Sequence, residues 1–142
     1  MKRRYNRDRW FIDLAHLIAQ RSEDPYVKVG AIVVRDDYSV IGVGYNGAPA
    51  GVDLDATTWA DRGARRPYMI HAEMNAIRYA RPREVWAIYT THIPCEHCMS
   101  VLGSYGTSVV VYSHPLGENY DETTIRRIAS INSITLRQQE MK

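Results

Sequence analysis

Two short motifs limit the ways in which this chain can fold more than any other part of its sequence. His71-Ala72-Glu73 and Pro94-Cys95-Glu96-His97-Cys98 each stand where non-helical chain gives way to a predicted helix. Cys95 and Cys98 are three residues apart, so both thiols can converge on one point beside the first turn of that helix. His71, at the start of the other helix, can supply a third ligand to a metal ion held there.

A ligand set of two cysteines and one histidine is typical of a catalytic zinc ion. Three protein ligands leave one tetrahedral position for water, and the metal lowers the pKa of that water greatly. The helix dipole and the metal both favour the thiolate forms of Cys95 and Cys98. Glu73 lies two residues after His71 and need not be a ligand, so it is placed to take the water's proton and pass it to a substrate.

Other interpretations of the same residues stay open. The Cys-x-x-Cys pair also occurs in thioredoxin-like redox sites, although the other elements of such a site are missing here. A structural zinc ion would need a fourth ligand, for which His92 or His114 could serve, but this leaves Glu73 without a role. We expect His97 to be partly exposed rather than a ligand, and His16 to be a packed or boundary histidine.

The composition is that of a globular protein and excludes several classes. The chain has 142 residues, of which 45% are hydrophobic and 24% charged, and we expect one zinc-dependent domain over residues 1–142. The net charge of +2 is too small to argue for nucleic acid, and two cysteines cannot form a disulfide scaffold. No apolar run approaches the roughly 18 residues of a membrane span, and no signal peptide is visible, so we expect a cytoplasmic protein.

The hydrophobic pattern predicts an α/β fold around a five-stranded mixed sheet. Helices are predicted over residues 8–20, 71–80, 96–105 and 121–130, and strands over 27–34, 39–45, 85–91, 107–112 and 133–136. The first two strands form a hairpin with its turn at 35–38, and the later alternation of strand and helix implies parallel strands. Residues 46–70 are expected to be a long loop that is either functional or disordered, and the basic residues 1–9 a solvated or mobile tail.

At these residues the chain resembles the deoxycytidylate (dCMP) deaminases of the cytidine deaminase superfamily. The resemblance runs from about Trp10 to Leu136, and His-x-Glu followed by Pro-Cys-x-x-Cys is the signature of zinc nucleobase deaminases. The segments Ala19-Gln20-Arg21-Ser22 and Gly42-Val43-Gly44-Tyr45-Asn46-Gly47 resemble the branch that uses nucleotides. The resemblance implies a three-layer α/β/α cytidine-deaminase-like fold.

The resemblance also implies the hydrolytic deamination of dCMP to dUMP and ammonia, which supplies dUMP for thymidylate synthesis. A zinc-activated water would attack C4 of the cytosine, while Glu73 would protonate N3 and then carry a proton to the leaving amino group. The implied substrate contacts are the backbone of Ala72 and Ile93 to the base edge, Asn46 to the sugar or base, Arg21 and Ser22 to the 5′-phosphate, and Tyr120 over the pyrimidine. Asn46 could instead be a turn residue and Arg21 a solvated helix-end cation.

Regulation is implied as well. Many members of the family are homo-hexamers that dCTP activates and dTTP inhibits, with Mg²⁺ on the triphosphate. The effector site resembles one built around Gly44-Tyr45-Asn46-Gly47, and because Asn46 would also contact substrate, a small shift there could couple the two sites. Residues 46–70 contain no Cys or His, so we expect one zinc ion per chain rather than the two seen in some members.

Three other functions stay open from the sequence. A tRNA or nucleic-acid deaminase shares the zinc motifs, and the basic N-terminal residues make it worth weighing, although nucleic acid is not the expected partner. A deaminase of free cytidine is a second alternative. A non-catalytic zinc-stabilised module is the third, and it would leave Glu73 dispensable.

Overall fold

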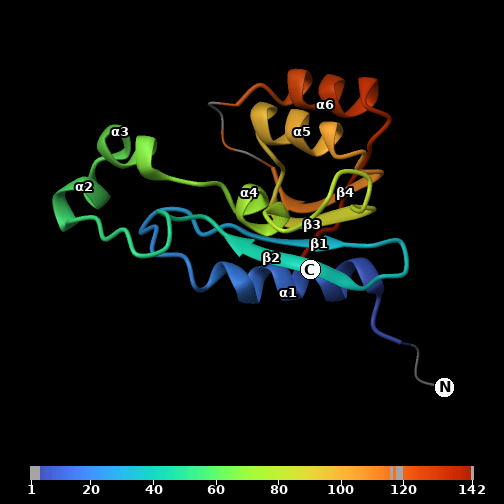
Figure 1. Ribbon diagram of the computed structural model, residues 1–142, viewed down its shortest axis with the longest axis horizontal. Helices are drawn as coiled ribbons and strands as arrows, with labels where there is room; N and C mark the ends of the chain where they lie inside the picture. Colours follow the sequence, from blue (N-terminus) through green and yellow to red (C-terminus); the bar gives the residue numbers. More distant parts are fainter. Residues whose placement is uncertain (1–3, 116, 118–119, 142) are drawn as a thin grey trace.

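The computed structural model describes residues 4–115, 117 and 120–141, which form a five-stranded sheet between two layers of helices (Figure 1). The strands are β1 (Gly30–Val34), β2 (Val40–Tyr45), β3 (Ala87–His92), β4 (Val109–His114) and β5 (Thr135–Gln138), in the order β2-β1-β3-β4-β5. β1 is antiparallel to both β2 and β3, whereas β3, β4 and β5 run parallel. The predicted three-layer α/β/α fold with a mixed sheet is confirmed.

Helices cover both faces of this sheet. Helix α1 (Arg7–Ala19) packs on one face, and the other carries α4 (Ala72–Ile77), α5 (Glu96–Ser104) and α6 (Glu122–Ile131) (Figure 1). The interior strand β1 is buried along its whole length, as expected for the apolar run Gly-Ala-Ile-Val-Val between two helical layers. The edge strands β2 and β5 are mostly exposed or half-buried.

Two glycines let helices lie directly on the sheet. A Cβ atom on Gly44 of β2 would lie 2.6 Å from the carbonyl oxygen of Ala72, and one on Gly30 of β1 would lie 2.7 Å from the backbone nitrogen of Ala19. Real Cβ atoms do not approach backbone so closely, so a larger residue at either position would push its helix away. Gly44 therefore sets the height of α4 above β2, and with it the position of the residues that begin α4.

The segment between β2 and α4 is not the plain loop that the sequence predicts. It holds two short helices, α2 (Ala56–Ala60) and α3 (Arg62–Arg65), and the 3₁₀ turn η1 (Arg66–Tyr68). The side chains of Asp55 and Asp61 accept hydrogen bonds from the first-turn amides of α2 and α3 and so cap them. An antiparallel bridge between Gly47 and Ile70 closes the base of the segment, which projects from the sheet (Figure 1).

The interpretation of residues 1–9 as a tail is wrong for residues 7–9, which form the first turn of α1. The Asp8 carboxylate accepts a hydrogen bond from the Tyr89 hydroxyl at 3.1 Å and pairs with the Arg137 guanidinium at 2.8 Å. These contacts connect the first turn of α1 to β3 and β5. Sequence periodicity cannot reveal such contacts because the partners are far apart in the chain. Residues 1–3 lie outside the described residues.

Every predicted helix and strand is present, and the boundaries differ by a few residues. β1 begins at Gly30 rather than at residue 27, because the Asp24 carboxylate accepts the amides of Tyr26 and Val27 and holds them in a turn. α4 ends at Ile77 rather than at residue 80. None of the helices formed by the described residues has the length and apolar character that crossing a bilayer requires.

We predict that Gly44→Ala lowers the free energy of unfolding by about 2–3 kcal/mol, because the added methyl group meets the backbone of α4 and neither can move freely. Gly47→Ala is the matched control, since a Cβ atom there meets nothing within 4 Å. Urea denaturation of the purified variants measures both. Equal stability of the two variants would show that α4 does not depend on this close approach.

Candidate functional site

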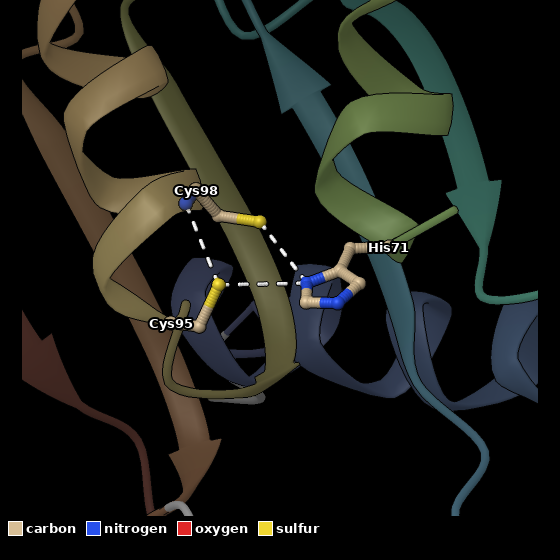
Figure 2. A group of neighbouring side chains, drawn as sticks. All are labelled: His71, Cys95 and Cys98. Atoms are coloured by element: carbon tan, nitrogen blue, oxygen red, sulfur yellow. Dashed lines mark hydrogen bonds between the residues drawn. The ribbon is translucent and has the colours of Figure 1, made fainter. Parts of the chain in front are cut away.

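The starts of α4 and α5 bring three potential metal ligands together. His71 and Cys95 are the N-cap residues of α4 and α5, each with extended backbone, and Cys98 lies in the first turn of α5. Figure 2 shows the imidazole and the two sulfur atoms pointing toward one another from the two helices. The Nδ1 atom of His71 lies 3.2 Å from the Cys98 sulfur and 3.5 Å from the Cys95 sulfur.

This geometry fits zinc. The three ligand atoms lie within 4.8 Å of one another. Zinc bonds of about 2.3 Å to sulfur and about 2.0 Å to nitrogen place such atoms roughly 3.5 Å apart in a tetrahedron, which is close to the spacing found here. Among the described residues, neither His92 nor His114 belongs to this cluster, so no fourth ligand for a structural ion is present there.

Hydrogen bonds link the three groups to one another. Hydrogen bonding from the Cys98 thiol, with help from His71, lowers the pKa of Cys95 to about 4. The same thiol–thiolate bond and burial raise the pKa of Cys98, and the bond to Cys95 raises the pKa of His71. One thiolate thus stands ready beside two further donors, which a divalent cation would deprotonate in turn.

Glu73 lies beside this cluster without belonging to it. The carboxyl group is in the first turn of α4, its residue is only 4% exposed, and Thr90 donates a hydrogen bond to Oε1 at 3.3 Å. Burial raises the pKa of Glu73. A buried carboxyl whose pKa is raised toward neutrality can both accept and release a proton, as a general acid and base must.

A cavity of about 1200 Å³ opens in front of the cluster. His71, Glu73 and Cys95 line it, as do four of the predicted substrate residues, Asn46, Ala72, Ile93 and Tyr120. This volume is ample for a small metabolite. The structure therefore brings most of the predicted site residues around one space.

The predicted phosphate partners lie elsewhere. Arg21 is exposed and does not line the cavity, and neither does the buried Ser22, whose hydroxyl donates to the carbonyl oxygen of Asn46 at 2.8 Å. The side chain of Asn46 is itself engaged, since Oδ1 accepts from Val29 at 2.8 Å and Nδ2 donates to Val27 at 2.9 Å. Ser22 and Asn46 thus hold the end of β2 against the chain that precedes β1.

The residues expected at an effector site surround the same strand end. Gly44 is buried under α4, Tyr45 is exposed, and Gly47 forms the bridge to Ile70. The carbonyl oxygen of Tyr45 accepts a hydrogen bond from the Asn75 side chain at 2.9 Å, which adds a second link between β2 and α4. The end of β2 is thereby joined mechanically to the helix that carries His71.

His92 is a cavity residue that the sequence did not single out for the substrate site. Its Nδ1 atom shares a hydrogen bond of 2.8 Å with the Thr91 hydroxyl, and burial, with the nearby His114 and His16, lowers the pKa of His92 to about 4. The His114 ring lies 5.4 Å from each of the other two imidazoles. His16 is half-buried beside Ser113, as expected of a boundary histidine, and His97 is exposed at the cavity rim.

Three arginines on the cavity wall were also missed. Arg62, Arg65 and Arg66 come from α3 and η1, inside the segment expected to be a loop. The signal that could have found them is their spacing, since three cations within five residues are unusual in a segment without an apolar face.

Comparison with known proteins gives relatives over most of the chain. The family model of the cytidine and deoxycytidylate deaminase zinc-binding region matches residues 5–114. Human deoxycytidylate deaminase is 32% identical over 126 residues, which cover 84% of this chain and 71% of the human protein. The deoxycytidylate deaminase of Mycobacterium phage D29 is 35% identical over 119 residues, covering 74% of this chain and 92% of the phage protein.

A solved structure shows the same fold. The crystal structure of dCMP deaminase from the cyanophage S-TIM5, in complex with dCMP and dUMP, matches 96% of this chain and 100% of the phage chain. The TM-score is 0.74 and the sequence identity is 23%, so this likeness concerns the fold.

We predict that the purified protein binds one zinc ion per chain and that Cys98→Ser abolishes this binding, because a hydroxyl is a far weaker zinc ligand than a thiolate. His97→Gln is the matched control, since this exposed residue of the same helix lies outside the cluster. Metal analysis by mass spectrometry after dialysis measures the stoichiometry. Two ions per chain, or loss of zinc from His97→Gln, would contradict this assignment of the ligands.

Proposed function

The chain belongs to the cytidine and deoxycytidylate deaminase family, and on this basis we propose that residues 1–142 act as one zinc-dependent domain that hydrolyses dCMP to dUMP and ammonia. The observation that carries the proposal is the buried Glu73 carboxyl beside the cluster of His71, Cys95 and Cys98, on the wall of the same cavity. The choice of dCMP is supported by relatives at 32% and 35% identity that are named deoxycytidylate deaminases.

The chemistry divides between the metal and the buried carboxyl. When held by His71, Cys95 and Cys98, zinc would supply a water of strongly lowered pKa, the nucleophile that hydrolysis at C4 requires. Glu73 moves the protons: one passes to N3 of the cytosine, where it stays, and the second passes to the amino group. The C4–O bond forms, the C4–N bond breaks, and the amino group leaves as ammonia, so atoms and protons balance.

Backbone groups on the cavity wall suit the edge of a cytosine. Ala72 lies in the first turn of α4, where an amide has no acceptor within its own helix and can donate to the O2 atom of the base. The amide of Ile93 already donates to the carbonyl oxygen of His114 at 2.9 Å, so Ile93 offers its carbonyl oxygen, which can accept from the amino group. One donor and one acceptor then match the two ends of the Watson–Crick edge.

Regulation and setting are inferred from the family resemblance. We expect a homo-hexamer in the cytoplasm that supplies dUMP for thymidylate synthesis, activated by dCTP and inhibited by dTTP with Mg²⁺ on the triphosphate. Gly44, Tyr45, Asn46 and Gly47 remain the residues proposed for the effector site. What supports coupling is the pair of links between β2 and α4, the close packing at Gly44 and the hydrogen bond from Asn75 to Tyr45.

We predict that Glu73→Gln lowers kcat for dCMP by about 10²–10⁴-fold while the zinc content and the melting temperature are kept, because the amide fills the same space but cannot carry a proton. Loss of the cytosine absorbance band and release of ammonia measure the reaction. Glu96→Gln is the matched control, an exposed carboxylate that lines the same cavity.

Parallel assays with cytidine, deoxycytidine and a single-stranded oligonucleotide separate the alternative deaminases. A wild-type protein that prefers the oligonucleotide would overturn the choice of dCMP. Full activity in Glu73→Gln would favour the non-catalytic zinc module.

We predict that the dCMP saturation curve shifts to higher substrate concentration when dTTP and Mg²⁺ are added and to lower concentration with dCTP, since an effector that favours one state must change its population. Steady-state kinetics and light scattering of the same sample give the shift and the oligomeric mass. Superimposable curves with and without dTTP would rule out this regulation.

A further inference from the structure

One wall of the cavity carries positive charge that the deamination step does not use. Arg62, Arg65 and Arg66 reach the cavity from α3 and η1 and line it together with His71 and Cys95. These arginines belong to the segment that projects beyond the sheet in Figure 1.

Arg65 is committed to holding the segment in place. Only 8% of the residue is exposed, its Nη1 atom donates to the carbonyl oxygen of Trp59 at 3.1 Å, and its Nε atom lies 3.7 Å from the Asp24 carboxylate. The guanidinium also lies over the Tyr26 ring, 4.6 Å from its centroid. A buried cation with a carboxylate, a carbonyl and an aromatic face has its charge satisfied within the protein.

The same contacts join two distant parts of the chain. Asp24 lies between α1 and β1 and receives the amides of Tyr26 and Val27, while the Tyr26 hydroxyl donates to the carbonyl oxygen of Ala60 at 3.0 Å. The projecting segment is thereby anchored at its middle by Arg65 and Tyr26, and at its base by the bridge between residues 47 and 70.

Arg62 and Arg66, in contrast, are exposed at the cavity and have no acidic partner among the residues that the structure describes. Both arginines line the same cavity as His71 and Glu73. These two guanidinium groups thus lie without an acidic partner among the described residues, on a segment that Arg65 and Tyr26 anchor. They line the same cavity as the site for a neutral base, so they favour binding of a ligand that also carries an anionic group.

We propose that Arg62 and Arg66 bind the 5′-phosphate of the nucleotide substrate and that Arg65 positions them through Asp24. This inference rests on the proposed function and specifies which residues make that site select a nucleotide over a nucleoside. Guanidinium groups suit a phosphate monoester because they donate two parallel hydrogen bonds to its oxygens. The assignment replaces Arg21 and Ser22 as phosphate partners, since Arg21 lies outside the cavity and the Ser22 hydroxyl is engaged.

The test compares kcat/KM for dCMP and deoxycytidine, without any triphosphate, in Arg62→Ala, Arg66→Ala and Arg66→Lys. We expect kcat/KM for dCMP to fall about 10- to 100-fold in each alanine variant, through a higher KM, because a charge-assisted hydrogen bond is lost. We expect no change in kcat/KM for deoxycytidine. Arg66→Lys should recover part of the loss because it keeps the charge but not the planar fork. Arg127→Ala, an exposed cation of α6 outside the cavity, is the control.

Each outcome separates this proposal from the proposed function. A wild-type protein that deaminates no cytosine compound refutes the proposed function. A wild-type dCMP deaminase whose Arg62→Ala and Arg66→Ala variants keep their preference for dCMP refutes the phosphate assignment alone. Loss of that preference in Arg21→Ala, with both other variants unaffected, would restore the partners expected from the sequence.

The positioning role of Arg65 needs a separate measurement. Arg65→Met should raise the KM for dCMP and leave kcat/KM for deoxycytidine unchanged, because only the phosphate depends on the placement of the segment. Arg65→Lys should restore part of the affinity, since a lysine ammonium can still pair with Asp24. Equal losses on both substrates, following the melting temperature of the variants, would show that Arg65 is only structural.

Discussion

The N-termini of α4 and α5 lie beside each other, and the chemistry of the site follows from that placement. Only three residues separate the end of β3 from the start of α5, whereas α4 is held over β2 by close packing at Gly44. The two helix starts then present His71 from one side and Cys95 and Cys98 from the other. Because helix N-termini favour anionic groups, the Cys95 thiolate gains stability from the start of the helix that carries it.

A second arrangement, centred on Asp24, shapes the opposite side of the cavity. Its carboxylate receives two backbone amides and faces the guanidinium of Arg65, while the adjacent Ser22 and Asn46 hold the end of β2. Ser22 and Asn46, which the family resemblance assigns to substrate binding, thus form hydrogen bonds that support the cavity wall. The side chains left for the anion, Arg62 and Arg66, stand on a segment that this network anchors.

The helix and strand periodicities were confirmed because they depend on neighbouring residues in the chain. The three predicted metal ligands lie close together in the structure, as a shared metal ion would require. The prediction that residues 46–70 form a plain loop was wrong in detail. The helices α2 and α3 are too short to show a hydrophobic period, and they depend on the Asp55 and Asp61 caps. The prediction of a tail was wrong for residues 7–9 because Asp8 contacts Tyr89 and Arg137, and no local sequence pattern indicates contacts between residues so far apart.

The sequence by itself determined the fold class, and it was enough to predict His71, Cys95 and Cys98 as metal ligands and Glu73 as the acid–base residue, because each prediction follows from residue types at short spacing. Only the tertiary structure decided which cations reach the cavity. Arg21 and Arg66 are both exposed, but only Arg66 lies on the cavity wall. That placement depends on contacts between distant segments, which local propensity does not encode.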